Sequence, residues 1–454
     1  MPLLEKHEQD LKTGIDAINY KQQRINTYWN YYNDIQAPKY LNQEMEEKFK
    51  NLSDRFSLNL CRLAVIAPLN RLWVESWENS SAQNLWESLK LDREQKRIYK
   101  HAMVAEESYV VGWRGDSTRI AFNDARIIHL FYKIDQPHVK DFAVKVWQER
   151  KGLYRATIYY ADEIVRLVGS VNHKDYHDRY LEQVKPDNKR RDGQVLSAHF
   201  DYDPDDPGGP HSMGEVPVWR FSTDMWMPES KLADLVPIQD AINKLRSNKM
   251  VASESNAYPQ RVYFTIQDLK RQDLENDPNT ALILDPGDRE SPASAQQFEA
   301  PDLRGYDSAI SAEVQNFFTV SHLPRHLLIA PGADSSGDAI RSDEGPFQEM
   351  VRDIATNFGY TLSDMMSSLL QTDEHLIPEW KDARINNTES QAREFKMLVE
   401  AGMPTAYAAK KSFQWSIEEA LSSGLSESPE ENVVNLSDRS VASPRTQTTE
   451  DEAQ

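Results

Sequence analysis

The stretch Glu229-Ser-Lys-Leu-Ala-Asp-Leu-Val-Pro-Ile-Gln-Asp-Ala-Ile-Asn243 opens a long segment with one narrow apolar stripe. Apolar residues three or four apart predict a helix over residues 230–255 that packs on one side and meets water on the other. Pro237 predicts either a kink or the first turn of the main part of this helix. The stripe comprises Leu232, Leu235, Ile238, Ile242 and Leu245, and the polar faces include Lys244, Arg246 and Lys249.

Downstream of this helix the pattern changes twice. Residues 258–305 read as a compact β-containing excursion, and a shorter helix is expected over 306–320. A loop rich in glycine and serine, residues 330–337, then leads into the clearest helical pattern of the chain. Gly345-Pro346 predicts a kink near the start of that helix. Its apolar face comprises Phe347, Val351, Ile354, Phe358, Leu362, Met365 and Leu369.

The N-terminal half reads as mixed helix and strand. Helices are predicted over residues 5–32, 49–77 (with Pro68 limiting or kinking the helix) and 84–107. Between residues 119 and 168, β-rich runs at 126–130, 142–147 and 156–160 predict a meander or small sheet. Residues 108–113 and 216–221 are predicted to be further strands. The polar, turn-rich stretch 173–212 is expected to be an exposed insertion.

The C-terminal part is predicted to hold small helices followed by a tail. Thr388 with Gln391 and Ser416 with Glu419 fit capping boxes, and Gly402 is expected to end the intervening helix. From Ser422 onward few large apolar residues remain to offset the cost of ordering the chain, so that segment is expected to be disordered.

Composition excludes several classes of protein. The chain has 454 residues, a formal net charge of −20 and one cysteine. No apolar run reaches the ~20 residues of a membrane span, and the first residues lack the layout of a signal peptide. The acidic balance argues against coating nucleic acid by bulk charge. Cys61 lies in an apolar run and is expected to be a buried, unreactive thiol in reducing surroundings.

Motifs for catalysis are missing. In Gly332-Ala-Asp-Ser-Ser-Gly337, Asp338 stands where a phosphate-binding loop needs lysine. His173 and His177 have ligand spacing, but their charged neighbours favour a solvated face. The helix, glycine, helix pattern over residues 388–411 lacks the basic N-terminal residues of a DNA-reading helix, which favours simple packing. The sequence therefore predicts no enzyme, no metal site and no cofactor.

Several segments carry a resemblance when they are taken in order. They are Asn84-Leu-Trp-Glu-Ser-Leu-Lys-Leu-Asp92, Ala161-Asp-Glu-Ile-Val-Arg166, Gly214-Glu-Val-Pro-Val-Trp-Arg-Phe221, the stretch Glu229 to Asn243, Ala257-Tyr-Pro-Gln-Arg261, Ser336-Gly-Asp-Ala-Ile340 and Leu398-Val-Glu-Ala-Gly402. Over residues 45–420 the chain resembles the portal proteins of tailed bacteriophages, the head-to-tail connectors of siphophage type. One departure is Glu106-Glu107, which stands where such proteins often have a glycine before Ser-Tyr-Val.

The resemblance implies an α+β, predominantly helical portal fold that forms rings. Its regions would be a wing (1–229), a stem helix (230–257), a clip (258–305), a second stem helix (306–322), a tunnel loop (323–338), a long kinked wing helix with a strand (339–387), a crown (388–421) and an acidic tail (422–454). The implied DNA-channel residues are Asp334, Ser335, Ser336, Lys244, Arg246 and Lys249. The implied clip residues that dock the terminase are Asp285, Asp288, Arg289 and Glu290.

The implied function is that of a non-enzymatic portal at one capsid vertex, a channel for DNA packaging and ejection. Its partners would be further copies in a dodecamer, the terminase large subunit, scaffolding and major capsid proteins, a head-completion or adaptor protein, and double-stranded DNA passing without sequence recognition. No membrane is involved. The protein would occur in the virion, and in the host cytoplasm during assembly. The alternatives are an adaptor or minor head protein without a DNA channel, and a hydrolase or nuclease with an unrecognised site.

Overall fold

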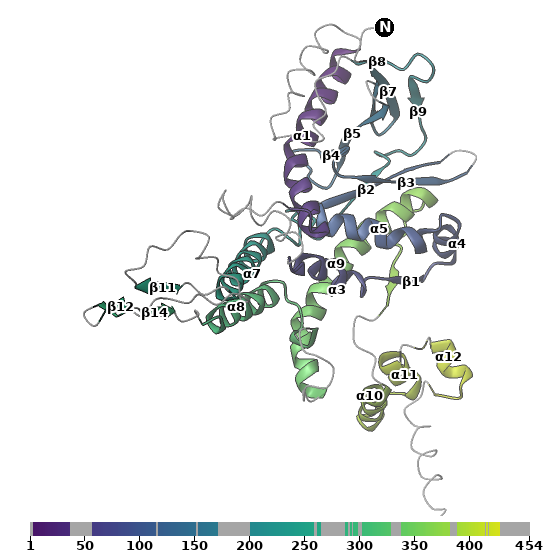
Figure 1. Cartoon of the computed structure of the whole chain (residues 1–454). Helices are drawn as coiled ribbons and strands as arrows, with labels where there is room; N and C mark the ends of the chain where they lie inside the picture. The colour runs from purple at the N-terminus through teal and green to yellow at the C-terminus, as the bar shows by residue number, and fades with distance from the viewer. Residues whose placement is uncertain are drawn as a thin grey trace, which may run out of the picture. The chain divides into compact units, whose positions relative to one another are not determined.

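The computed structural model describes residues 3–36, 57–114, 117–150, 153–170, 200–257, 261–264, 287–288, 291–292, 294–297, 302–327, 337–381, 388–413, 415 and 417–426. The described chain is mixed α/β (Figure 1). It divides into two compact units, Met1–Lys381 and Asp382–Gln454, and each is described by itself.

The elements follow one another in a mixed order. The helices are α1 (Glu5–Asn33), α3 (Leu60–Leu69), α4 (Ser80–Ser88), α5 (Leu91–Val104), α7 (Leu235–Ala257), α8 (Arg304–Val320), α9 (Gly337–Leu370), α10 (Thr388–Glu400), α11 (Thr405–Phe413), α12 (Ile417–Ser422) and the short 3₁₀ helix η2 (Arg325–Leu327). The strands are β1 (Val74–Trp77), β2 (Glu107–Trp113), β3 (Arg119–Asp124), β4 (Ile128–Tyr132), β5 (Lys140–Arg150), β6 (Leu153–Tyr159), β7 (Glu163–Ser170), β8 (Phe200–Tyr202), β9 (Gly208–Pro210), β10 (Val218–Ser222), β11 (Arg261–Phe264), β12 (Gly287–Asp288), β13 (Ser291–Pro292), β14 (Ser294–Gln297) and β15 (Pro378–Trp380).

The predicted meander is confirmed as the centre of a six-stranded antiparallel sheet. Its order is β4-β5-β6-β7-β8, and β9 also pairs with β7. Alternate residues of β5 point to opposite faces, and those on one face, such as Val144 and Val146, pack against Leu11, Ile15 and Ile18 of α1. Figure 1 shows α1 lying along this sheet. The predicted N-terminal helix is therefore the cover of one sheet face.

A second, three-stranded sheet has the order β10-β2-β3. The helices α5 and α9 pack against it, and the Tyr99 ring stacks on Phe358 at 4.8 Å between centroids. The apolar face predicted for the long helix is confirmed in full, because all seven of its residues are buried. The helix is continuous through Pro346, although a proline inside a helix removes one backbone hydrogen bond and crowds the carbonyl of the preceding turn.

The helices α7 and α8 form an antiparallel pair. Lys249, late in α7, forms an ion pair with Asp307, early in α8. Pro237 lies in the first turn of α7, where its missing N–H costs nothing. The helix starts at Leu235 rather than at Ser230, because the Ser230 hydroxyl donates to the Val104 carbonyl at 2.7 Å and holds that stretch as a turn. Between α7 and α8, β11 pairs with β14 and β12 with β13.

Two helix predictions were wrong in part. The helix predicted to reach Trp77 ends at Leu69, and Val74–Trp77 is the strand β1, which pairs with β15 some three hundred residues later in the chain. The helix predicted over 84–107 is two helices, α4 and α5, separated by Lys90 in the left-handed region at φ 55°. Neither pairing with a strand far along the chain nor a single residue with a positive φ leaves a periodic signal in the sequence.

Parts of two segments expected to be irregular are ordered. Within 173–212, Phe200–Tyr202 and Gly208–Pro210 add strands to the sheet, and Gly208 has φ +92° where a Cβ would collide with the Ile164 carbonyl. In the C-terminal unit, the Ala406 N–H donates to the Ser426 carbonyl at 3.0 Å, so the fold continues past Ser422. His173 and His177 lie outside the described residues, as does the tail after Ser426.

The C-terminal unit holds three short helices, as the capping signals predicted. Gly402, at φ +86°, ends α10 in the left-handed conformation that glycine accepts most readily. Ala406, Ala409 and Ala420 are buried together, so small side chains let α11 and α12 approach closely. For α11, the second helix of the α10–α11 pair, the sequence favoured such packing over DNA reading.

Candidate functional site

The three cations expected at the stem all lie on α7. Lys244 is exposed, Arg246 is half-buried, and Lys249 is engaged by Asp307 of α8. At ~100° of rotation per residue, Arg246 lies about 200° and Lys249 about 140° around the helix from Lys244. The fold therefore brings the three onto one helix but not onto one face of it, and Lys249 joins the two helices.

The other residues singled out for the channel and the clip fall mostly outside the described residues. These are Asp334, Ser335, Ser336, Asp285, Arg289 and Glu290. Asp288 is described as part of β12, where its backbone pairs with Ser291 of β13.

The two flanks of the glycine- and serine-rich loop meet on α9. The Arg325 N–H, in η2, donates to the Asp343 carboxylate. His326 lies 3.6 Å from the Glu344 carboxylate, which is itself 3.4 Å from the Arg71 guanidinium. The described residues on the two sides of that loop, η2 and residues 343–344 of α9, therefore contact each other directly.

The α7–α8 pair has little core of its own. From Asn243 to Ser253 no residue of α7 is buried, and on α8 only Phe317 and Phe318, near its end, are buried. Apolar side chains along both helices stay half-buried: Leu245, Met250, Val251, Tyr306, Ile310 and Val314. Isolated helices gain most of their stability from packing an apolar face. This pair therefore offers apolar surface that a neighbouring molecule can cover.

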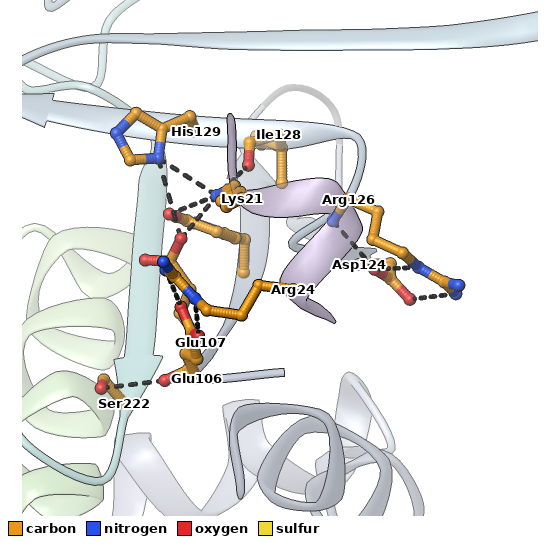
Figure 2. Close-up of polar contacts among 10 residues, drawn as sticks. Lys21, Arg24, Glu106, Glu107, Asp124, Arg126, Ile128, His129 and Ser222 are labelled. Atoms are coloured by element: carbon orange, nitrogen blue, oxygen red, sulfur yellow. Dashed lines mark hydrogen bonds and ion pairs between the residues drawn. The ribbon is translucent and has the colours of Figure 1, made fainter. Parts of the chain in front are cut away.

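A buried ionic network ties α1 to the two sheets, and sequence analysis did not find it. Figure 2 shows the Lys21 side chain of α1 among Glu107 of β2 and Ile128 and His129 of β4. Its Nζ lies 2.5 Å from the Glu107 carboxylate, 2.9 Å from the Ile128 carbonyl and 3.1 Å from His129 Nδ1. Both charged side chains are only 5% exposed.

The network holds its charges through pairing. Burial alone would raise the pKa of the Glu107 carboxyl, but Lys21 and His129 outweigh it and hold that pKa well below its usual range. Burial lowers the pKa of the Lys21 ammonium, against the opposing effect of Glu107. Burial also lowers the pKa of His129. Removing either partner of a buried pair of this kind would leave the other charge buried and unpaired.

Glu106, the residue before Glu107, explains the departure from glycine at this place. Its φ is 69°, in the left-handed region that disfavours side chains. Its carboxylate accepts two bonds from Arg24 of α1, one of them 2.7 Å long, and its carbonyl accepts from the Ser222 hydroxyl at 3.0 Å (Figure 2). The side chain therefore supplies contacts between α1 and β2 that glycine would lack.

A cleft of about 620 Å³ lies where the Trp113 end of β2 faces the six-stranded sheet. Its walls include Trp147, Tyr159 and Lys145, on the face of the sheet opposite α1. The Lys145 ammonium lies 4.7 Å from the centre of the Trp147 ring, and burial lowers its pKa. Arg155 at the rim is paired with Glu149 at 2.5 Å and with Asp203.

No three metal-ligating side chains of the described chain converge, and Cys61 is buried, where burial raises the pKa of its thiol to about 12. That thiol is unreactive at neutral pH, as its apolar run predicted. Among the helices of the described segments, none combines the length and the apolar character needed to cross a bilayer.

Comparisons with known proteins give structural likeness only. The chain matches no protein-family model, and no curated protein matches it. Its fold is similar to a chain in the neck of a native gene transfer agent (GTA) particle with C12 symmetry, at 10% identity and a TM-score of 0.45, over 80% of this chain and 90% of that one. It is also similar to a chain in the neck of an empty GTA particle with C6 symmetry (11%, 0.45, 86% and 96%) and to one in the virion of a native GTA particle (11%, 0.40, 74% and 79%).

Proposed function

We propose that this chain is a virion structural protein of portal type, which forms a ring at one capsid vertex of a tailed phage or phage-like particle and conducts double-stranded DNA. The observation that carries the proposal is the order of elements in one unit: α7, a small β lobe, α8, and the long helix α9. That is the succession of stem, clip, stem and wing helix that the resemblance in sequence implies.

The α7–α8 pair supports assembly on physical grounds. An ion pair near the surface, such as that of Lys249 with Asp307, contributes only about 0–1 kcal/mol, and the apolar contacts of the two helices are half-buried, so the pair gains little stability by itself. Repeating the pair around an axis would cover its apolar residues with those of the next copy. The proposed ring is the dodecamer expected of the portal family.

The charge of the chain suits a passage rather than a binding site for DNA. With a net charge of −20, each copy adds far more carboxylates than cations to the assembly. Tight binding of duplex DNA draws on many Lys and Arg contacts to phosphate. A ring of such copies would let DNA slide without deep wells, with the terminase large subunit docking on the clip and head-completion proteins replacing it later. No enzymatic activity or cofactor belongs to this proposal.

Electron microscopy and mass photometry of the purified full-length protein test the proposal. The expected particles are rings with an axial hole wide enough for a double helix. Closed particles without a through-channel would favour the adaptor or minor head protein, and a monomer at all concentrations would overturn the ring. Metal-dependent cleavage of DNA by the same preparation would favour the nuclease.

A matched pair of variants tests the role of the α7–α8 surface. Ile310, half-buried on α8, is expected to lie between copies, so Ile310→Asp should shift the preparation from rings to smaller species. Ser311→Asp adds the same charge at the exposed neighbouring position and should leave rings intact. Equal ring yields from both variants would remove this surface from the assembly contacts.

A further inference from the structure

A short loop between β10 and α7 presents three large apolar side chains to solvent. Met225, Trp226 and Met227 are 44%, 66% and 78% exposed. We call residues 224–229 the knob. Tryptophan and methionine are enriched where protein surfaces bind one another, and tryptophan is among the residues that contribute most to binding. Three such side chains in succession at the tip of a loop therefore point to a contact with another macromolecule.

The knob is held rigidly. The Asp224 carboxylate accepts from the Trp226 and Met227 N–H groups at 2.7 and 2.8 Å. The Met225 carbonyl accepts from the Arg220 guanidinium at 2.6 Å. Just before the knob, the Thr223 carbonyl accepts from the Asn357 side chain of α9 at 2.7 Å. A loop fixed in this way loses little conformational freedom on binding, which favours affinity.

The cleft at the Trp113 end of β2, on the same chain, has side chains suited to bind the knob. Its volume of about 620 Å³ falls in the range that encloses a compact ligand. Its walls combine aromatic and apolar groups such as Trp147 and Ile164 with charged side chains, most of which pair with one another: Arg155 with Glu149 and Asp203, and Arg166 with Asp206. Lys145 brings an ammonium group to it without an ion-pair partner among the described residues. The exposed Glu229 carboxylate of a knob would supply the opposite charge.

The two features lie at opposite ends of one sheet. In the pairing of β10 with β2, Ser222, next to the knob, is opposite Glu107, whereas the cleft begins at Val111 and Trp113. Six residue steps of extended strand separate the ends of β2 by about 20 Å. A knob cannot therefore fill the cleft of its own chain, but it can fill that of a neighbour.

We propose that the knob of one copy inserts into the cleft of the next, with Trp226 as the anchor, so that copies join head to tail. The inference rests on the proposed ring, and it names the contact that would close it. When two different patches form the contact, every open string of copies has a free knob at one end and a free cleft at the other. Further copies can therefore add until the string closes into a ring. The partner is thus a second copy of this chain.

Cysteine pairs test the contact directly in the full-length protein. Met227→Cys combined with Ala121→Cys, a residue of the cleft wall, should yield a covalent ladder up to the ring when a short bis-maleimide is added. Each single variant should yield dimers at most. The natural thiol, Cys61, is buried and should not compete. Met227→Cys with Ile134→Cys is the control pair, because Ile134 is fully exposed and lies outside the cleft.

Loss of the anchor gives a second readout that distinguishes this inference from the proposed function. Trp226→Ser should raise the dissociation constant of the assembly by at least about 30-fold, while Ile134→Ser leaves it unchanged. The knob contact would be overturned if Trp226→Ser still formed rings like those of the wild type and the first cysteine pair gave no ladder. The proposed ring itself would then still stand. Absence of rings from the wild type would overturn the ring itself.

Discussion

Replacing Glu107 with glutamine tests the buried network that joins α1 to the sheets. The substitution keeps the shape of the side chain and one acceptor oxygen but removes its charge. The Lys21 ammonium, 5% exposed, then loses its ion-pair partner and keeps the amide oxygen, the Ile128 carbonyl, His129 and the Tyr109 hydroxyl as neighbours. Removing one partner of a buried ion pair costs about 3–5 kcal/mol. The loss of the Lys21 proton sets an independent upper limit on this cost. Holding a group of ordinary pKa 10.5 neutral at pH 7 costs about 5 kcal/mol.

Hydrogen–deuterium exchange of peptides from α1 measures this loss where it occurs. If the amides of α1 exchange through opening of the whole helix, a loss of about 3–5 kcal/mol makes them exchange roughly 150- to 5000-fold faster. Glu94→Gln is the matched control, since the Glu94 side chain is 42% exposed and its ion pair is with Arg97 of the same helix. It should change exchange by less than about threefold.

The reasoning would be refuted if Glu107→Gln exchanged at the rate of Glu94→Gln. A double variant, Lys21→Met with Glu107→Leu, sharpens the test. Replacing both partners of a buried pair by apolar groups of similar size leaves no unpaired charge and is often close to neutral. The double variant should therefore recover most of the protection that Glu107→Gln loses, and a loss as large as that of the single variant would show that packing, not charge, holds α1.

Three further predictions concern Glu106, Asp124 and the point at which the chain is ended. Glu106→Ala should destabilise the protein by more than Glu106→Gly, because both lose the Arg24 pair but alanine also keeps the left-handed strain of ~1–2 kcal/mol; equal urea midpoints would contradict this. The depressed pKa of Asp124 gives stability that is present above its ordinary value of 3.8 and is lost as pH falls. The urea midpoint of Asp124→Asn should therefore fall less steeply than that of the wild type between about pH 5 and pH 3, and parallel slopes would contradict the assignment. Ending the chain after Ser426 should preserve the circular-dichroism signal and exchange protection of α11, whereas ending it after Leu421 should lower both, since Ser426 bonds to the start of that helix; equal protection would place Ser426 outside the fold.

Several parts of the structure could be predicted because their signals are local. The face of α9 that begins at Phe347 was read in full from spacing alone, since one face of a helix repeats every three or four residues. The strands of the meander follow from alternation and turn residues, and Gly402 marks a helix end through its own backbone preference. The sequence also indicated that Cys61 is buried, because its immediate neighbours are apolar.

The remaining features depend on residues that meet only in the folded chain. The pairing of β1 with β15 and the meeting of Lys21 with Glu107 join segments far apart in the sequence. A run of four residues or a lone lysine carries no mark of such a partner. The knob is three apolar residues in a loop until the fold leaves Trp226 exposed and fixed. Periodicity records which face of an element is buried, whereas long-range contact is set by how the elements pack, and that only the tertiary structure decided.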